Sequence, residues 1–115
     1  MLHQGSCHCG KVAFEVEMEL DQVMECNCSH CSRKGFLLAF TPAETFRLLT
    51  PRHGLATYHF NKHAIDHHFC ETCGCAPFAE GKGREGEPTV AINARCVTTV
   101  EIGDLTRIPV DGRSR

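Results

Sequence analysis

The chain has 115 residues, 23% of them charged, and a formal net charge of −2, with 9 cysteines, 8 histidines and no tryptophan. This length predicts a single domain, residues 1–115, and the mildly acidic charge without a basic stripe argues against nucleic acid as a partner. No window approaches the roughly 20 apolar residues of a membrane span, and the chain does not begin with a basic and then apolar leader, so we expect a cytoplasmic protein that does not contact a membrane.

The first predicted elements are β-strands. Residues 11–18 alternate between apolar side chains and more polar ones, which predicts a strand with one buried face. Residues 23–28 predict a second strand that leads into a cysteine-rich turn. Residues 36–40, with the sequence FLLAF, form a short apolar run, and its length predicts a strand buried on both faces rather than a helix.

One helix is predicted, in the segment TPAETFRLL. Thr41 has the position of an N-cap, Pro42 that of the first helical residue, and Glu44 follows the cap by the spacing of a capping box. Because Pro51 and Gly54 come soon afterwards, the helix can have only about two turns.

The second half of the chain predicts further short strands. Residues 55–60 and 63–69 predict a hairpin, and residues 75–79 and 89–95 predict two more strands around a glycine-rich loop. The segment from Gly103 onward gives little periodic signal. The predicted fold class is therefore mostly β, with about seven short antiparallel strands and one short helix.

Seven of the 9 cysteines fall into closely spaced clusters. These are the pair Cys7 and Cys9, the triplet Cys26, Cys28 and Cys31, and the pair Cys70 and Cys73. In a reducing compartment such spacings are more typical of metal ligands than of disulfides, and an odd total cannot pair completely. Gly10 and Gly74 directly follow the two pairs and would allow the backbone to curl around an ion.

The clusters predict two zinc sites of different kinds. The two pairs together offer four thiolates, which is a closed structural site that would tie the first strands to the middle of the chain. The triplet offers three, which would leave one position open for an incoming thiol. The alternative is that another residue closes this second site; the candidates are Cys75, Cys96, His30, His67 and His68. As non-ligands, the two cysteines among them would be small core residues.

Three motifs carry a resemblance to a known family. GSCHCGKVAFEV, CNCSHCSRKG and HHFCETCG, in this order, resemble the glutathione-dependent formaldehyde-activating enzyme family, which includes centromere protein V; AINARCV and VDGRS extend the likeness more weakly. The resemblance implies an Mss4-like antiparallel β fold with two zinc ions, structural on the two cysteine pairs and catalytic on the triplet. The implied activity is that of a carbon–sulfur lyase, the reversible joining of glutathione and formaldehyde as S-hydroxymethylglutathione.

Histidines near the triplet are candidates for proton transfer. His30, between two predicted ligands, is the first candidate for the general acid that protonates the hemithioacetal oxygen, and His67 or His68 comes next. A histidine in this position is equally typical of an exposed turn or of a hydrogen bond to sulfur.

Arg33 and Lys34 are the candidates for substrate binding. They directly follow the triplet and could bind the carboxylates of glutathione, although an ordinary solvated turn would have the same composition. Phe60 and Phe69 are predicted to be core residues rather than walls of a substrate site.

Other classes of function stay open at this point. A non-catalytic zinc-binding module that mediates a protein interaction would have a closed second site and no effect on thiol chemistry. A zinc-ribbon nucleic-acid binder is disfavoured by the negative charge. An iron–sulfur cluster is compatible with the number of cysteines.

Overall fold

The computed structural model describes residues 1–114, in which it has ten strands, one α-helix and four 3-10 turns. The strands are β1 (Leu2–Ser6), β2 (Ala13–Glu17), β3 (Gln22–Cys26), β4 (Leu38–Pro42), β5 (Phe46–Leu48), β6 (Leu55–Tyr58), β7 (Asp66–Cys70), β8 (Phe78–Lys82), β9 (Pro88–Asn93) and β10 (Thr106–Val110). The helix is α1 (Ser29–Lys34), and the 3-10 turns are η1 (Ala43–Thr45), η2 (Arg52–Gly54), η3 (Ala94–Cys96) and η4 (Ile102–Asp104). The predicted fold class, mostly β with one short helix, is confirmed.

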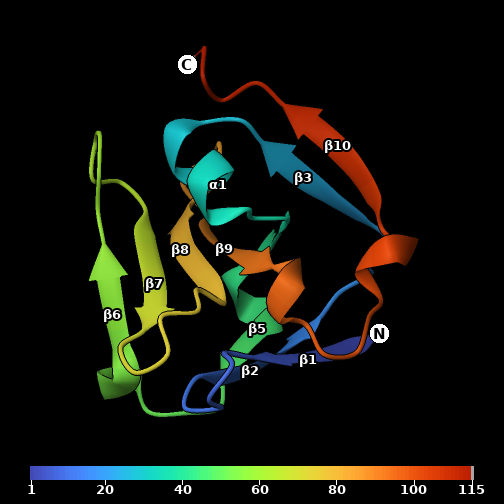
Figure 1. Cartoon of the computed structure of the whole chain (residues 1–115), viewed down its shortest axis with the longest axis vertical. Coiled ribbons are helices and arrows are strands. Elements are labelled where there is room, and N and C mark those ends of the chain that lie inside the picture. Colours follow the sequence, from blue (N-terminus) through green and yellow to red (C-terminus); the bar gives the residue numbers. More distant parts are fainter. Residues whose placement is uncertain (115) are drawn as a thin grey trace.

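The strands form two sheets (Figure 1). The smaller sheet has the order β1-β2-β5, and the larger has the order β10-β3-β4-β9-β8-β7-β6. Neighbouring strands are antiparallel except for β10 and β3, which are parallel. Strand β10 therefore lies beside β3, although the two are far apart in the sequence. This pairing brings the segment after β10 close to the cysteine triplet, which begins at the end of β3.

The main core lies between the two sheets. Alternation along β2 buries Phe14 and Val16 completely, as predicted for residues 11–18. The ring centroid of Phe14 lies 5.4 Å from that of Phe46, and Phe46 lies 4.7 Å from Phe78 of the larger sheet. These packed aromatic side chains join the sheets through apolar contact, which is the main source of folding free energy available to a small domain.

The opposite face of the larger sheet is open. On β4 the side chains of Ala39 and Thr41 are buried against the core, whereas Phe40 between them is 51% exposed. The prediction that residues 36–40 are buried on both faces is therefore wrong. No second layer covers this side of β4 in the described part of the chain; it borders a cavity instead.

The helix predicted from Thr41 is also wrong. Thr41 and Pro42 end β4, and Thr41 pairs with Val90 of β9. Its hydroxyl bonds to that of Thr45 at 2.6 Å rather than capping a helix, and Glu44 is exposed. Pairing and burial of Thr41 outweigh the local helix-start signal, as tertiary contacts commonly do for a helix of two turns. Within residues 1–114 no helix has the length and hydropathy needed to cross a membrane.

Other segments also differ from the sequence prediction: the strand predicted for residues 75–79 is β8 at Phe78–Lys82, and β1, β5 and α1 were not predicted. The hairpin of β6 and β7 forms, but the strands stop at Tyr58 and resume at Asp66, so the connection is a loop rather than a tight turn. The C-terminal segment, which gave little signal, forms η4 and β10.

Candidate functional site

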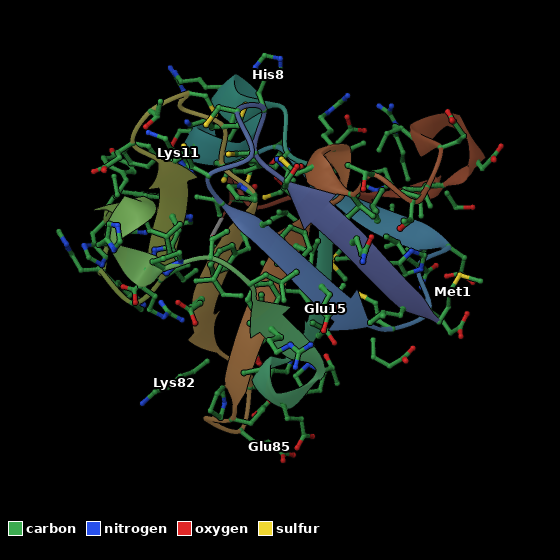
Figure 2. All side chains as sticks on the ribbon, turned by 90° about the horizontal axis from the view of Figure 1, so that it is seen from below. Met1, His8, Lys11, Glu15, Lys82 and Glu85 are labelled. Atoms are coloured by element: carbon green, nitrogen blue, oxygen red, sulfur yellow. The ribbon has the colours of Figure 1, made fainter. Side chains whose placement is uncertain are left out.

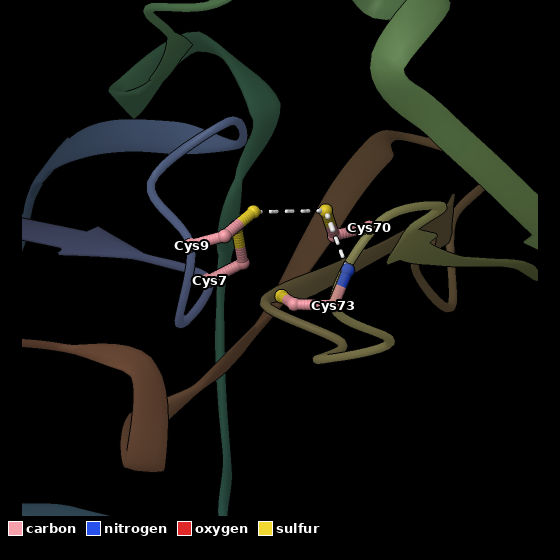
Figure 3. A group of neighbouring side chains, drawn as sticks. All are labelled: Cys7, Cys9, Cys70 and Cys73. Atoms are coloured by element: carbon pink, nitrogen blue, oxygen red, sulfur yellow. Dashed lines mark hydrogen bonds between the residues drawn. The ribbon is translucent and has the colours of Figure 1, made fainter.

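Four cysteines from distant segments converge at one end of the smaller sheet (Figure 3). Cys7 and Cys9 lie in the turn between β1 and β2, and Cys70 and Cys73 lie in the turn that begins at the end of β7. Their sulfurs lie within 4.8 Å of one another, with 3.7 Å from Cys7 to Cys9 and 3.6 Å from Cys9 to Cys70. Sulfurs about 2.3 Å from a central zinc in a tetrahedron are about 3.8 Å apart, so the cluster has the size of a zinc–thiolate site.

Backbone N–H groups point at these sulfurs. Val12 donates to Cys7 Sγ at 3.3 Å, and Thr72 and Cys73 donate to Cys70 Sγ at 3.4 and 3.5 Å. Such donors stabilise thiolates and fix the orientation of metal ligands. The donor set, all sulfur with amides around it, is one that suits zinc.

The four thiols are not all ionised together without a cation. The backbone N–H groups of Cys75 and Cys9 lower the pKa of Cys73 to about 5. The N–H of Lys11 also favours the thiolate of Cys9, but desolvation and hydrogen bonds with Cys70 and the other cluster cysteines raise the pKa of Cys9 to about 11. Because neighbouring thiolates repel one another, a bound cation would allow all four to deprotonate.

The triplet forms a second cluster at the start of α1. Cys26 ends β3, Cys28 is the N-cap of α1, and Cys31 lies within the helix. Their sulfurs lie within 4.8 Å of one another. The N–H of Cys31 donates to Cys28 Sγ at 3.3 Å, and that of Cys28 faces Cys26 Sγ at 3.5 Å. Desolvation opposes ionisation of Cys28, but the N–H of Cys31 and other hydrogen bonds outweigh it and lower its pKa.

None of the predicted rivals joins the triplet. Among residues 1–114, no further cysteine, histidine or acidic side chain lies within 4.8 Å of all three sulfurs. Cys75 packs instead against the main core beside Cys70, and Cys96 Sγ accepts a hydrogen bond from Asn93 at 3.8 Å. The grouping into four and three, predicted from spacing, is also the grouping in space.

The C-terminal strap, which we define as residues 110–113, is fastened beside the triplet by Asn27. The backbone N–H of Asn27 donates to the carbonyl of residue 110 at 3.1 Å, and its Nδ2 donates to Asp111 Oδ1 at 3.0 Å. The N–H of Arg113 donates to Asn27 Oδ1 at 2.8 Å. Asn27 lies between two of the clustered cysteines, so the strap is anchored at the cluster itself.

A cavity of about 720 Å³ adjoins the triplet on the open face of the larger sheet, and the three cysteines form part of its wall. The register of the sheet sets its shape. Phe40 pairs with Ala91, Ala91 with Ala79, and Ala79 with His67, so one row across β4, β9, β8 and β7 has two alanines between two ring side chains. Alternation in strands places paired residues on the same face, so the alanines form a low floor between higher walls.

His30 lies behind this cavity rather than in its wall. Its ring centroid lies 5.5 Å from Tyr58, 5.0 Å from Phe60 and 4.5 Å from His67. Burial and then the charge of Lys34 lower its pKa, and its Nδ1 is buried without a hydrogen-bond partner among the described residues. It is half-buried, not exposed, and it borders a second cavity of about 540 Å³.

His67 and His68 line both cavities. Burial, and then repulsion from His30, lower the pKa of His67 to about 4, so it is neutral at pH 7. His68 is 6% exposed, and both ring nitrogens have partners: Thr57 Oγ1 at 2.9 Å and Glu80 Oε1 at 2.7 Å. Both ring nitrogens of His68 are therefore occupied by structural hydrogen bonds, whereas the His67 side chain makes no hydrogen bond among residues 1–114.

The predicted substrate-binding cations lie beside the second cavity. Arg33 and Lys34 both line it. Arg33 donates to the carbonyl of Ser29 at 2.9 Å, and Lys34 Nζ lies 5.7 Å from the centroid of the Phe69 ring. Phe60, predicted to be a core residue, lines the larger cavity; the prediction is wrong because no other layer covers the hairpin loop on this side within the described residues.

Several residues of the larger cavity were not indicated by sequence. The floor residues Ala79 and Ala91 and the cations Lys82 and Arg84 all line it. The sequence TVAIN shows which side chains of β9 share a face. It does not show which strands pair with β9 and so complete the cavity. Sheet order was the missing information.

Comparisons with known proteins agree with this arrangement. The sequence profile of the family described as glutathione-dependent formaldehyde-activating enzyme matches residues 2–106. Among solved structures, the crystal structure of a Rhodobacter sphaeroides protein is similar with a TM-score of 0.79 and 30% sequence identity, over 92% of this chain and 97% of that chain. The family match contains all seven clustered cysteines and ends before the strap.

Proposed function

This chain belongs to the glutathione-dependent formaldehyde-activating enzyme family, and we propose that it is a zinc-dependent carbon–sulfur lyase acting on the adduct of a thiol with formaldehyde or a related small aldehyde. The family implies a formaldehyde-activating activity, and two cysteine clusters could hold metal ions. The observation that supports the lyase most directly is that the two clusters have different numbers of sulfurs. One cluster has four sulfurs; the other has three and lies beside a cavity.

The residues present fit two zinc ions. The four-cysteine cluster would hold a structural zinc. The triplet, whose three cysteines line the cavity, would hold a second one, and no further ligand comes within reach among residues 1–114. A zinc ion bound there would supply a Lewis acid that lowers the pKa of a thiol toward neutrality.

The chain's own residues would handle the rest of the reaction. In the cleavage direction the C–S bond breaks, its electron pair leaves on sulfur, the hydroxyl oxygen becomes the carbonyl oxygen, and the hydroxyl proton is lost. His67 is in the wall of the larger cavity and would take that proton and return it during addition; its pKa of about 4 makes it a weak base, so it would hold the proton only transiently. His30, the first candidate from sequence, contacts His67 and would hold its ring in place.

Substrate binding would use the same two cavities. The apolar walls exclude water from the reacting atoms, which strengthens electrostatic interactions there. Arg33 and Lys34 are proposed to bind a carboxylate of glutathione in the smaller cavity, which shares Phe36, His67, His68 and Ala76 with the larger one.

Metal analysis of three proteins, combined with exchange measurements, tests the proposal. Wild type should contain two zinc ions and accelerate exchange of formaldehyde with glutathione, followed by NMR. Cys28→Ser should keep the fold, lose one zinc and lose the acceleration. Cys96→Ser, which removes a thiol outside both clusters, should keep both zinc ions and the acceleration. Two zinc ions with uncatalysed exchange in wild type would contradict the lyase and favour a non-catalytic binding module.

A further inference from the structure

The larger cavity has far more room than the aldehyde part of a formaldehyde adduct needs. Its volume of about 720 Å³ lies within the range of roughly 300–1,000 Å³ for pockets that enclose drug-sized ligands. A formaldehyde adduct places only one carbon and its hydroxyl group beyond the thiol sulfur. With that sulfur at the triplet, which forms part of the cavity wall, such an adduct would leave most of the cavity empty of ligand.

The part of the cavity next to the triplet is apolar. Met24 of β3 pairs with Leu38 of β4, and Cys26 lies two residues after Met24 on the same face. Further from the triplet, Phe40 and its partner Ala91 continue this surface. Met24 and Phe40 are 39% and 51% exposed, and all four apolar side chains line the cavity. A ligand that covers them would remove apolar surface from water, which is favourable.

The polar side chains in this part of the cavity already have hydrogen-bond partners. Asn93 Nδ2 donates to the carbonyl of Ala76 at 3.0 Å, and Asn93 Oδ1 accepts from the N–H of Arg95 at 3.2 Å. Both ring nitrogens of His68 also have partners. An apolar group bound here would therefore not take water away from these polar atoms without compensation, which is the usual cost of burying them. His67 stays available for the hydroxyl group of the adduct.

The floor of the larger cavity ends at Ile65. Ala91 pairs with Ala79, and the next row on this face is Thr89 paired with Gly81. A Cβ added to Gly81 would lie 3.5 Å from Ile65 Cγ1, so Ile65 packs over that row. Neighbouring rows on one face are about 7 Å apart, because they are two residues apart along a strand. The floor between the triplet and Ile65 therefore has room for one aromatic ring rather than for a long chain.

Beyond this floor the charged side chains have both signs. Alternation places Lys82 on the opposite face of β8 from the floor, whereas a Cβ added to Gly83 would collide with the carboxylate of Glu87. Glu85 directly follows Arg84 in the turn. Figure 2 shows Lys82 and Glu85 at the tip of this hairpin, at the opposite end of the molecule from the β1–β2 turn. The larger cavity therefore suits an uncharged group.

The charges that suit glutathione line the smaller cavity. Arg33 and Lys34 lie there, and no acidic side chain is among the described residues that line it. Helix α1 contains both of these cations and Cys31 of the triplet. The two cavities also share Phe36 and His67. A ligand with its sulfur at the triplet could therefore extend a charged arm into one cavity and an apolar arm into the other.

We propose that the preferred aldehyde of this site has an apolar substituent, such as a single aromatic ring, that lies over Ala91 and Ala79. The inference rests on the proposed function and concerns the aldehyde half of the adduct, while the charged arms of the thiol lie beside Arg33 and Lys34. In the cleavage direction the C–S bond breaks, its electron pair stays on sulfur, and the hydroxyl oxygen becomes the carbonyl oxygen of the apolar aldehyde. The hydroxyl proton ends on the released thiol, so the step needs no oxidant or reductant.

Calorimetric titration of the zinc-loaded full chain with glutathione and two of its thioethers tests the inference. S-methylglutathione has one carbon on the sulfur, and S-benzylglutathione has the same carbon with an aromatic ring attached. S-benzylglutathione should bind at least about tenfold more tightly, because burial of a ring of this size favours binding by that factor or more. Catalysis should follow binding: with glutathione, kcat/KM should be about tenfold higher for phenylacetaldehyde than for acetaldehyde, measured by NMR.

Substitutions in the two cavities locate the two halves of the ligand. Ala91→Phe should abolish the advantage of the benzyl group and leave the affinity for S-methylglutathione unchanged, because only the ring lies over the floor. Ala79→Leu is the second variant if the first does not fold. Arg33→Ser combined with Lys34→Ser should weaken both thioethers by the same factor. Leu49→Phe, which adds a ring outside both cavities, is the control and should change neither affinity.

The outcomes separate the two proposals. If glutathione does not bind, or if wild type does not accelerate exchange, the proposed function fails and this inference fails with it. If glutathione binds and exchange is accelerated but S-benzylglutathione binds no more tightly than S-methylglutathione, the proposed function stands and the inference is overturned; failure of both thioethers to bind counts as this result. An equal loss of both thioethers in a folded, zinc-loaded Ala91→Phe variant would also overturn it.

Discussion

Gly112 lies so close to Cys26 that a Cβ added to it would be 2.4 Å from Cys26 Sγ and 3.1 Å from Cys28 Cβ. The backbone of Gly112 is outside the left-handed region, so contact with the sulfur, rather than its φ, is what requires glycine here. The strap therefore covers one side of the triplet, and the cavity lies on another. Asn27 holds this arrangement by clamping the strap through both its backbone and its side chain.

Gly112→Ala should weaken metal binding at the triplet and leave the four-cysteine cluster unchanged. The added methyl group must displace either the strap or Cys26, and disturbing a group that packs on a ligand typically costs about 10–100-fold in metal affinity. Stepwise transfer of zinc to a chromophoric chelator measures both sites in one titration. Gly103→Ala is the matched control, because nothing lies within 4 Å of its added Cβ. Identical release curves for the two variants would show that the strap does not position the triplet.

Cys70→Ser should unfold the protein, in contrast to Cys28→Ser. Cys70 is fully buried and its cluster ties the β1–β2 turn to the end of β7. Structural zinc in small domains contributes about 10–16 kcal/mol of binding free energy, comparable with or larger than the whole stability of a domain. Far-UV circular dichroism during heating should show no cooperative transition for Cys70→Ser. A transition equal to that of Cys28→Ser would contradict the structural role of the four-cysteine cluster.

Much of this fold could be predicted because local patterns decided it. The alternation in residues 11–18 is present in β2, whose apolar side chains pack on Phe46 and Phe78. The failures occur where distant pairing decides the structure. Thr41 has a helix-start sequence but pairs with Val90, which is 49 positions away along the chain (90 − 41). The alternation rule could not show that β10 would lie parallel to β3, since only Ile108 and Val110 alternate there and Pro109 between them disfavours a strand.

The candidate site also has one part that could be predicted from the sequence and one part that could not. The cysteine clusters could be predicted because their ligand spacing is local and each cluster closes in space as its spacing indicated. The floor of the larger cavity could not be predicted, because it needs Phe40, Ala91 and Ala79 from three strands in register. The role of Gly112 could not be predicted either, because glycine is required at this position by contact with a cysteine of another strand.

His67 should make the stability of the protein depend on pH. Its pKa falls from 6.5 to about 4 on folding, so between these values the unfolded chain binds a proton that the folded chain does not. Protonation of His67 in the unfolded chain therefore leaves the free energy of unfolding unchanged above pH 6.5 and lowers it as the pH falls toward 4. Between pH 7.5 and 5.5, wild type should lose about 1 kcal/mol more than His67→Gln, measured by urea unfolding with excess zinc.

His8→Gln serves as the control for this measurement, because His8 is exposed and lies outside both cavities. It should keep the pH slope of wild type. If His67→Gln also keeps that slope, the imidazole of His67 is not held neutral by burial.

Glu80→Gln should destabilise the protein at neutral pH by about 1.5–3 kcal/mol, the range for a lost hydrogen bond to a charged group. Glu80 accepts from both terminal nitrogens of Arg52 at 3.0 Å and pairs with the buried His68 at 2.7 Å. Arg52 is the main reason that the pKa of Glu80 is lowered, with His68 contributing further, so the stabilisation is present above the usual pKa of a glutamate and is lost as the pH falls through the lowered value. The difference between wild type and variant should therefore be constant from pH 6 to pH 8. Glu44→Gln, which changes an exposed glutamate, is the control and should leave the urea midpoint unchanged. If Glu80→Gln also has the wild-type midpoint, the contacts of the Glu80 carboxylate with Arg52 and His68 do not stabilise the protein.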